Sequence, residues 1–206
     1  FPNKQDVLRY VLTINAPENK DNDFTWKDFQ NRNNGELVSV LGNFINRVVV
    51  LTKKYYESLI PDPNTLLSVD NDVINSANES ILKIEQLITN FKFRDACTEF
   101  MNIARIGNKY LADEEPWKVI KDNPERVETI IFVSLHLSSI LAVVAEPFLP
   151  FTSQKIKNIL NYKNHNIDWS WKNLKQKQFI ISNGIKINEP ELLFSRIEDS
   201  EIQYQI

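Results

Sequence analysis

TIIFVSLHLSSILAVVAEPFL, residues Thr129–Leu149, is the longest apolar run in this 206-residue chain. It is about as long as a membrane-spanning helix, which needs roughly 20 apolar residues. Polar side chains interrupt the run at Ser134, His136, Ser138, Ser139 and Glu146. The centre of a helix bundle also requires a helix that is apolar on most sides. The run therefore predicts a central bundle helix that begins at Asn123-Pro124 and breaks at Pro147, and no membrane partner is expected.

Amphipathic helices are predicted on both sides of this run. Thr25 is expected to cap a long helix that runs toward Ser58. Its apolar positions alternate steps of four and three, as a core-facing stripe does: Leu37, Leu41, Phe44, Val48, Leu51 and Tyr55. Similar stripes mark residues 70–89 and 93–112, and Thr152 is expected to cap a last helix. Because the chain has only four glycines, a doubly wound sheet is disfavoured and an all-α bundle is predicted.

Composition and motifs argue against an active site in this chain. No Gly-rich phosphate loop, GxSxG or HExxH is present. Cys97, His136 and His165 lack the spacing of a metal site, so no metal or catalytic residue is predicted. Glu114 and Glu115 are sequence neighbours whose side chains diverge, and we expect them to favour a helix N-terminus. The single cysteine indicates a reducing compartment.

Polar residues set into the apolar helices are the remaining candidates for function. Asn43 and Arg47 are four residues apart, so they share one helix face. Gly42 precedes Asn43, Gly107 precedes Asn108, and Trp117 directly follows Pro116 at the start of a short helix. One interpretation is structural: the glycines mark helix crossings, the asparagines satisfy buried backbone, and Trp117 is a hydrophobic staple. The other is a recognition surface for unstacked RNA bases, which are read by aromatic rings, guanidinium planes and amide groups.

The sequence blocks that contain these residues resemble one known family. RNNGELVSVLGNFINR (32–47) and NKYLADEEPWKV (108–119) resemble the two signature blocks of the anticodon-binding domain of methionyl-tRNA synthetases. AEPFLPFTSQKI (145–156) and GIKINEPELLFSRIED (184–199) resemble the next helix junction and the closing segment of that domain. QDVLRYVLT (5–13) resembles the segment that follows the KMSKS loop of the family. The resemblance covers nearly the whole chain.

The resemblance implies an anticodon-reading role within a ligase that attaches methionine to tRNA(Met) with ATP and Mg²⁺. Trp117 and Pro116 match the family's base-stacking tryptophan and the proline beside it. Asn43 and Arg47 match the pair that contacts the bases of the CAU anticodon. Asn46, Lys54 and Asn108 are added on helix geometry alone. The expected partner is therefore the anticodon loop of tRNA(Met) and not DNA, and a cytoplasmic location is expected.

The chain departs from the family at its catalytic motifs. HIGH, KMSKS and the metal-binding knuckle are absent. We therefore expect no cofactor in this chain and no aminoacylation by it alone. Residues 1–20 are interpreted as a helical connection to a catalytic core, 21–163 as the anticodon-binding bundle, and 164–206 as an extended tail, with a short hairpin, that wraps back on the bundle. The net charge of −3 predicts weak binding with specificity at the anticodon.

Two alternatives stay open at this point. In the first, the chain is a purely structural or protein-docking bundle with Trp117 buried. In the second, it belongs to a related synthetase for another amino acid. The paired Gly-Asn-x-x-x-Arg and Pro-Trp blocks favour methionine. The oligomeric state is left undecided.

Overall fold

The computed structural model describes residues 4–18, 21–176, 179–203 and 205. Within these ranges the fold is helical, with one isolated β-bridge and no β-strand, which confirms the all-α prediction. The helices in chain order are α1 (Gln5–Ile14), α2 (Trp26–Arg32), η1 (Asn33–Gly42), α3 (Asn43–Tyr56), α4 (Ser68–Thr89), α5 (Phe93–Glu114), α6 (Pro116–Val119), α7 (Pro124–Val144), α8 (Pro150–Ile159), η2 (Tyr162–Asn164), α9 (Trp171–Gln176) and α10 (Asp199–Gln203).

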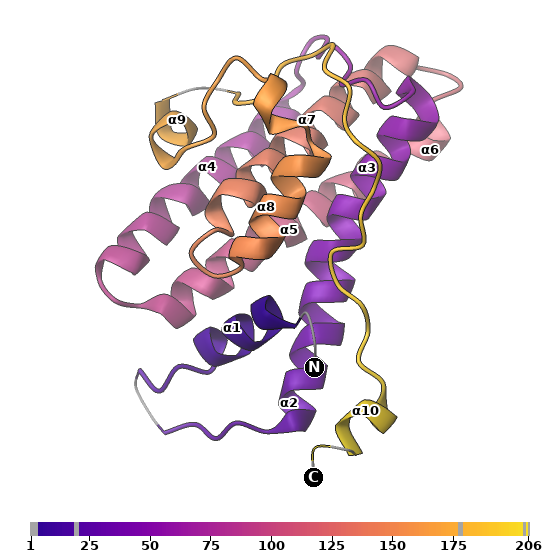
Figure 1. The fold of residues 1–206 in the computed structure, drawn as a ribbon. Helices are drawn as coiled ribbons and strands as arrows, with labels where there is room; N and C mark the ends of the chain where they lie inside the picture. Colours follow the sequence, from indigo (N-terminus) through magenta and orange to yellow (C-terminus); the bar gives the residue numbers. More distant parts are fainter. Residues whose placement is uncertain (1–3, 19–20, 177–178, 204, 206) are drawn as a thin grey trace.

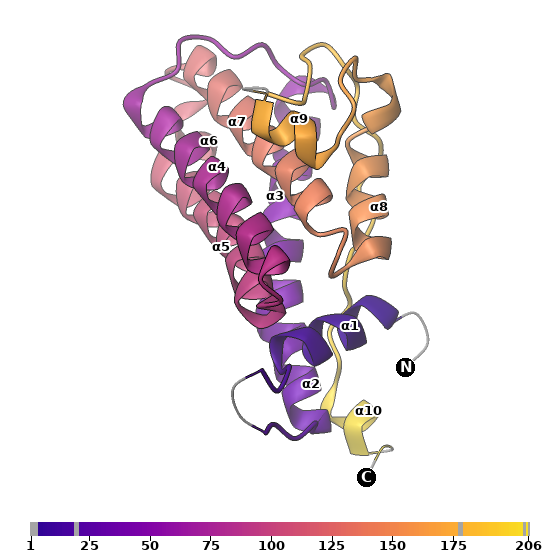
Figure 2. The same ribbon diagram turned by 90° about the vertical axis from the view of Figure 1, so that its left-hand side faces the viewer.

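Helix α7 forms the centre of the bundle and is the predicted apolar helix. It packs against α3, α4, α5 and α8, which surround it in both ribbon views (Figures 1 and 2). It begins at Pro124 as predicted, and Asn123 caps it, because its Oδ1 accepts the backbone N–H of Arg126 at 3.0 Å. Two helices, α7 and the continuous helix Trp26–Tyr56, are long and apolar enough to cross a membrane. The apolar window of α7 is 94% buried, so burial in the bundle accounts for its composition.

The predicted long helix is present but is not α-helical throughout. Thr25 caps it as expected, since its hydroxyl accepts the backbone N–H of Asp28 at 3.1 Å. α2, η1 and α3 follow without a break, yet η1 is a π-helix whose turns are wider than those of an α-helix. Ser39 Oγ accordingly donates to the carbonyl of Asn34, five residues back, at 2.6 Å. The alternation of apolar residues predicted the helix but not its π segment.

The junction of α7 and α8 is held by α1 rather than by a threonine cap. The prediction that Thr152 caps the last bundle helix is wrong: α8 begins at Pro150, and Thr152 lies inside it. The backbone N–H and hydroxyl of Thr152 both donate to Asp6 Oδ2 of α1, at 2.6 and 2.7 Å. Arg9 donates to the carbonyls of Pro147 and Phe148 at 2.9 and 3.2 Å. Asp6, near the beginning of the chain, therefore caps α8.

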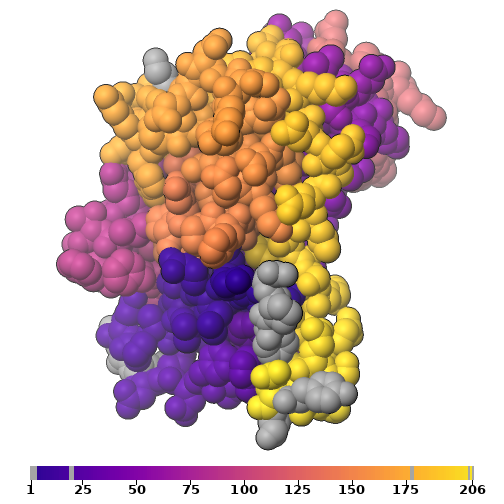
Figure 3. All heavy atoms as spheres, in the orientation of Figure 1, coloured from indigo at the N-terminus to yellow at the C-terminus, as the bar shows by residue number. Residues whose placement is uncertain are grey.

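The tail beyond η2 lies along the outside of the bundle and follows the long helix down to α10 (Figures 1 and 3). The expected hairpin is not formed among the described tail residues. The chain turns at Gly184, where φ is +73°, and Lys186 then makes an antiparallel bridge with Leu59, ahead of α4. The backbone N–H of Ile60 donates to Ile185 O at 2.9 Å. The segment following the turn thus pairs with a distant loop rather than with the segment before it.

The lower part of the tail is held by the first signature block. Asn34 both donates to Ile197 O and accepts from the backbone N–H of Ile197, each at 2.9 Å. Asn33 donates to Ser195 O at 3.0 Å, and Gln30 donates to Ile197 O at 3.0 Å. These amides give an extended segment the backbone hydrogen bonds that a sheet would otherwise supply. The asparagines of this block therefore have a structural role in holding the tail.

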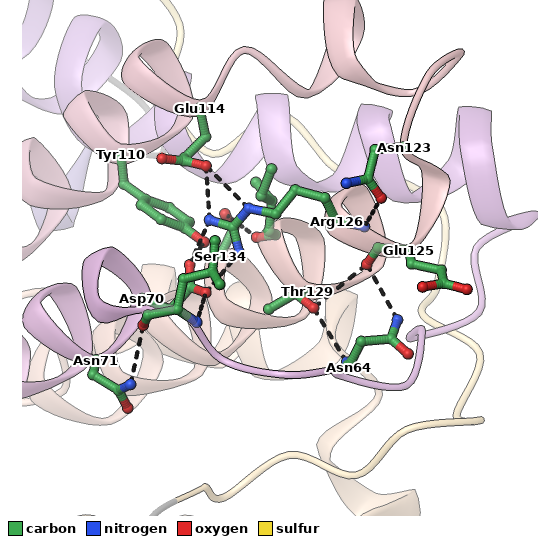
Figure 4. A network of polar contacts seen from close by, with 12 residues as sticks. Asn64, Asp70, Asn71, Tyr110, Glu114, Asn123, Glu125, Arg126, Thr129 and Ser134 are labelled. Carbon is green, nitrogen blue, oxygen red and sulfur yellow. Dashed lines mark hydrogen bonds and ion pairs between the residues drawn. The ribbon is translucent and has the colours of Figure 1, made fainter.

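A buried ionic network joins α4, α5 and α7 near the end of the bundle that carries α6 (Figure 4). Arg126 of α7 makes two bonds to the carboxylate of Asp70, at 2.6 and 2.8 Å, and two to Glu114 Oε2, at 2.7 and 3.1 Å. Tyr110 donates its hydroxyl to Asp70. Burial alone would raise the pKa of Asp70, but hydrogen bonds from Arg126, Tyr110 and Leu67 outweigh it and hold this pKa below its ordinary value. Of the two glutamates expected near a helix N-terminus, Glu114 instead ends α5 and pairs with Arg126, whereas Glu115 occupies the N-cap position of α6 without a side-chain cap bond.

Candidate nucleic-acid interface

Trp117 is presented by a sharp reversal of the chain between α5 and α6. Glu115 adopts a left-handed conformation with φ 43° and ψ 54°, which costs a non-glycine residue roughly 1–2 kcal/mol. Pro116 then starts α6 and is buried, so its fixed φ directs the next residue outward. Trp117 is 37% exposed, which excludes the alternative in which this ring is sealed inside the bundle.

The exposed indole lies against the long helix. The guanidinium carbon of Arg47 sits 5.1 Å from the centre of the Trp117 ring, within the range of a cation–π contact. A shallow pocket opens beside the pair and is lined by Asn46, Arg47, Val50, Leu51 and Trp117. The pocket combines an aromatic ring, a planar cation, an amide and an apolar floor. These groups are suited to a flat ring with polar edges, such as a nucleobase.

The other predicted residues are placed differently. Asn43 is exposed and donates to Asn108 Oδ1 at 3.0 Å, one turn from Arg47. Asn108 in turn donates to the carbonyls of Val40 and Ala104, at 2.9 and 3.0 Å. Asn108 thus fixes Asn43 and joins the end of the π segment to α5. Lys54 lies outside the pocket, with its Nζ 5.1 Å from the ring centre of Tyr55.

Gly107 supports the helix-crossing interpretation, whereas Gly42 lies against its own helix and the tail. A Cβ on Gly107 would lie only 2.4 Å from the ring of Phe44, so this glycine lets the long helix and α5 approach closely. A Cβ on Gly42 would lie 3.1 Å from Leu37 O and 3.5 Å from the ring of Phe194 in the tail. Both glycines therefore serve packing. Trp117 and Arg47 are brought to one surface by this same crossing.

Sequence reasoning missed the apolar floor and the neighbouring groove. Val50 is exposed and lies one turn beyond Arg47, a position that the helical period alone would have indicated. A second groove runs between the long helix and the tail, and Asn46 belongs to both openings. Leu192, Phe194 and Arg196 line its far wall. No local pattern marks those residues, because the path of the tail decides their place.

The histidines and the cysteine lie away from the pocket. Cys97 is buried, and burial raises the pKa of its thiol. His136 is buried in α7, and His165 accepts the backbone N–H of Ser182 through Nδ1 at 3.0 Å. Across the described ranges, no three His, Cys, Asp or Glu side chains are arranged to hold a metal ion. The two histidines and the cysteine are therefore explained by packing.

Comparison with known proteins places this geometry in context. Residues 60–205 match the family described as the anticodon binding domain of methionyl tRNA ligase, and residues 3–49 match the class I tRNA synthetases (M). The chain is 53% identical to a methionine–tRNA ligase of Christiangramia forsetii over all of its own length and 30% of that relative. It is 51% identical to one of Flavobacterium johnsoniae, covering 32% of that protein. The chain thus spans about a third of the length of these curated relatives.

Solved structures show the same architecture. Methionyl-tRNA synthetase of Mycobacterium tuberculosis in its free state superimposes with a TM-score of 0.82 at 20% identity, over 94% of this chain and 39% of that one. Its complex with methionyl-adenylate gives a TM-score of 0.83 at 21% identity, over 93% of this chain and 37% of that one. The fold is therefore that of the helical region of a class I aminoacyl-tRNA synthetase. With its family match covering more than half of its residues, the chain belongs to the anticodon-binding domain family of methionyl-tRNA ligases.

Proposed function

We propose that the Trp117 pocket binds an unstacked base of the CAU anticodon of tRNA(Met). The observation that carries the proposal is the partly exposed indole in contact with Arg47, beside a pocket that both residues line together with Asn46. Stacking of one base on an aromatic ring contributes roughly 1–3 kcal/mol. The amide of Asn46 and the guanidinium of Arg47 supply both donors and an acceptor for base edges. Asn43, fixed by Asn108, adds a further amide one turn away.

The contact between Arg47 and Trp117 contributes by ordering the pocket in advance. Pro116 restricts the backbone and Arg47 restricts the ring, so less side-chain entropy is lost when a base binds. The base then gains its affinity mainly from stacking and edge contacts. With a net charge of −3, few phosphate contacts are expected, so the affinity should be modest and depend only weakly on salt.

The longer protein is proposed to be a cytoplasmic methionine–tRNA ligase that uses ATP and Mg²⁺. The names and identities of the relatives support this proposal. ATP is proposed to be handled by the HIGH and KMSKS motifs of that longer protein, which this chain lacks. The 206-residue chain alone is expected to bind tRNA without charging it.

The pocket is tested by binding of a labelled anticodon stem-loop with CAU, measured by fluorescence anisotropy against the same stem with a scrambled loop. Trp117→Ala should weaken binding of the CAU stem-loop roughly 5- to 150-fold, since roughly 1–3 kcal/mol of stacking is lost. Phe151→Ala removes from α8 an aromatic ring that is more exposed than Trp117, at 61%, and should leave binding unchanged. Equal affinity of the wild type for both loops would refute the proposal.

The role in the longer ligase is tested by separating its two reaction steps. Arg47→Ala should impair transfer of methionine to tRNA while leaving ATP-dependent activation of methionine near normal. The reason is that Arg47 lies at the tRNA pocket and not at a site for methionine or ATP. Equal damage to both steps would contradict the assigned role.

A further inference from the structure

The segment that carries Trp117, residues 115–123, is fastened at both ends by one residue, Arg126 (Figure 4). At its beginning, the Arg126 guanidinium bonds Glu114 Oε2 through Nε at 3.1 Å and Nη2 at 2.7 Å. At its end, the backbone N–H of Arg126 donates to Asn123 Oδ1 at 3.0 Å. The segment is therefore a closed loop whose two ends meet at α7.

Arg126 is itself immobilised. Its side chain is only 10% exposed, and it makes a two-pronged bond to Asp70, whose side chain has no exposure. Asp70 also accepts from the hydroxyl of Tyr110 and from the backbone N–H of Leu67. Because the guanidinium is planar and two of its bonds go to the buried Asp70, its other carboxylate partner, Glu114, is kept at a defined place. Helix α5 is thus made to end at one fixed point, immediately before the reversal at Glu115.

The backbone N–H of Glu115 also donates to Leu111 O at the end of α5, at 3.2 Å, but this bond is internal to α5 and does not tie its end to α7. The ion pair between Lys118 and Glu115, at 2.7 Å, is exposed and contributes little. Val119 and Ile120 are partly buried against the core, which holds the inner side of the segment but not the end of α5. The direction in which Trp117 leaves the bundle depends on where α5 stops, since only Glu115 and Pro116 lie between.

We propose that Glu114 and Arg126 are positioning residues for Trp117: together they hold its loop so that the indole faces Arg47. The effect of this positioning on RNA binding rests on the function proposed above, whereas its effect on the orientation of Trp117 does not. Neither residue contacts the pocket, since neither lines it. Loss of the Glu114 bond should release the end of α5 while leaving the Asp70–Arg126 pair and the core in place.

The orientation is tested by ¹⁹F NMR of the 206-residue chain labelled with 5-fluorotryptophan. The chain has four tryptophans, and Trp117→Phe identifies the Trp117 resonance. Glu114→Ala should shift or broaden that resonance in the absence of RNA, with the other three unchanged. Glu114→Gln keeps an acceptor oxygen for Arg126 and should restore most of the wild-type signal. Asp113→Ala, at the neighbouring position on an exposed pair with Lys109, is the matched control and should have no effect.

The same variants are then titrated with the CAU stem-loop. Glu114→Ala should weaken binding roughly 2- to 10-fold, since an indole that is no longer fixed must be ordered by the ligand. Asp113→Ala should bind as the wild type does. Thermal unfolding confirms that each variant is folded at the temperature of measurement. A folded Glu114→Ala chain with an unchanged Trp117 resonance would overturn the positioning role.

The two proposals fail in different ways. If the wild type does not distinguish CAU from a scrambled loop while Glu114→Ala still moves the Trp117 resonance, the RNA function fails and the positioning role stands. If the wild type binds CAU selectively and Glu114→Ala changes neither the resonance nor the affinity, the positioning role fails and the RNA function stands.

Discussion

Single residues set the closest approaches in this molecule. Gly107 is the clearest case, because the space that its missing side chain leaves is filled by the ring of Phe44. The sequence marks Gly107 as a place of close approach but does not say whether a helix or a ligand comes near. The structure decides for a helix. Trp117 and Arg47 then meet on the outside of the same crossing between the long helix and α5–α6.

Substitution of Gly107 by alanine should therefore destabilise the fold. The added Cβ would lie 2.4–2.9 Å from three atoms of the Phe44 ring, so either the ring or the helix must move. Overpacking of this kind typically costs about 1–3 kcal/mol. Urea denaturation of Gly107→Ala measures the loss directly. Gly35→Ala is the control: nothing lies within 4 Å of its Cβ, and alanine should stabilise the helix by up to about 1 kcal/mol. A Gly107→Ala chain as stable as the wild type would contradict the packing shown.

At the scale of the element, α7 combines an apolar surface with buried polar side chains. Ser134 and Ser138 donate to carbonyls one turn back, at 2.8 Å each, so their hydroxyls need no outside partner. His136 differs, because neither ring nitrogen has a hydrogen-bond partner among the described residues. Its ring packs edge-on against the ring of Phe179, with the two ring centres 4.9 Å apart. Burial lowers the pKa of His136 to about 3, so the ring is neutral at pH 7.

This histidine should make the stability of the fold depend on pH. The pKa of His136 is about 3 in the folded chain and 6.5 in the unfolded chain. The stability that its neutral ring contributes is therefore complete above pH 6.5 and is lost as the pH falls toward 3. Between pH 6.5 and 4.5 the unfolded chain binds up to one more proton, which lowers the free energy of unfolding by up to about 1.4 kcal/mol per pH unit. Denaturation curves across this range should show the slope in the wild type.

The matched variants for this prediction are two histidine substitutions. His136→Leu should flatten the slope between pH 6.5 and 4.5. His165→Gln should retain most of it, because His165 is bonded to Leu160 and Ser182 and is less buried. A His136→Leu chain with the wild-type slope would show that other groups cause the pH dependence.

At the scale of the whole molecule, the tail links parts of the chain that are far apart. It is attached at one end to the loop before α4 and at the other to the first turns of the long helix. Between these attachments it forms one wall of the groove that adjoins the Trp117 pocket (Figure 3). Phe194 is its main apolar contact in this stretch, 7% exposed and close to Gly42.

Removal of the Phe194 ring should release the tail. Phe194→Ala is expected to cost about 3 kcal/mol, since a nearly buried aromatic side chain is lost. Limited proteolysis should then cut between residues 185 and 197 under conditions in which the wild type resists. Leu192→Ala, in the same stretch but 74% exposed, should change stability by less than about 0.5 kcal/mol. Resistance of Phe194→Ala to cleavage would show that the other contacts of the tail suffice to hold it.

The sequence by itself determined the main helices of the bundle, the central position of α7 and the cap at Thr25, but not α9 and α10, which lie in the segment expected to be an extended tail. These features depend on residues a few positions apart, and the helical period fixes which of them share a face. The resemblance of two short blocks also led to the family to which the chain belongs.

Only the tertiary structure decided which distant side chains meet. Arg47 and Trp117 are 70 positions apart, and their contact depends on how two helices cross. The same holds for the bond from Thr152 to Asp6, which caps α8, for the pairing of the tail with Leu59, and for the bond from Arg126 to Glu114. The physical reason is that each contact is set by the packing of whole elements around α7, which no local spacing encodes.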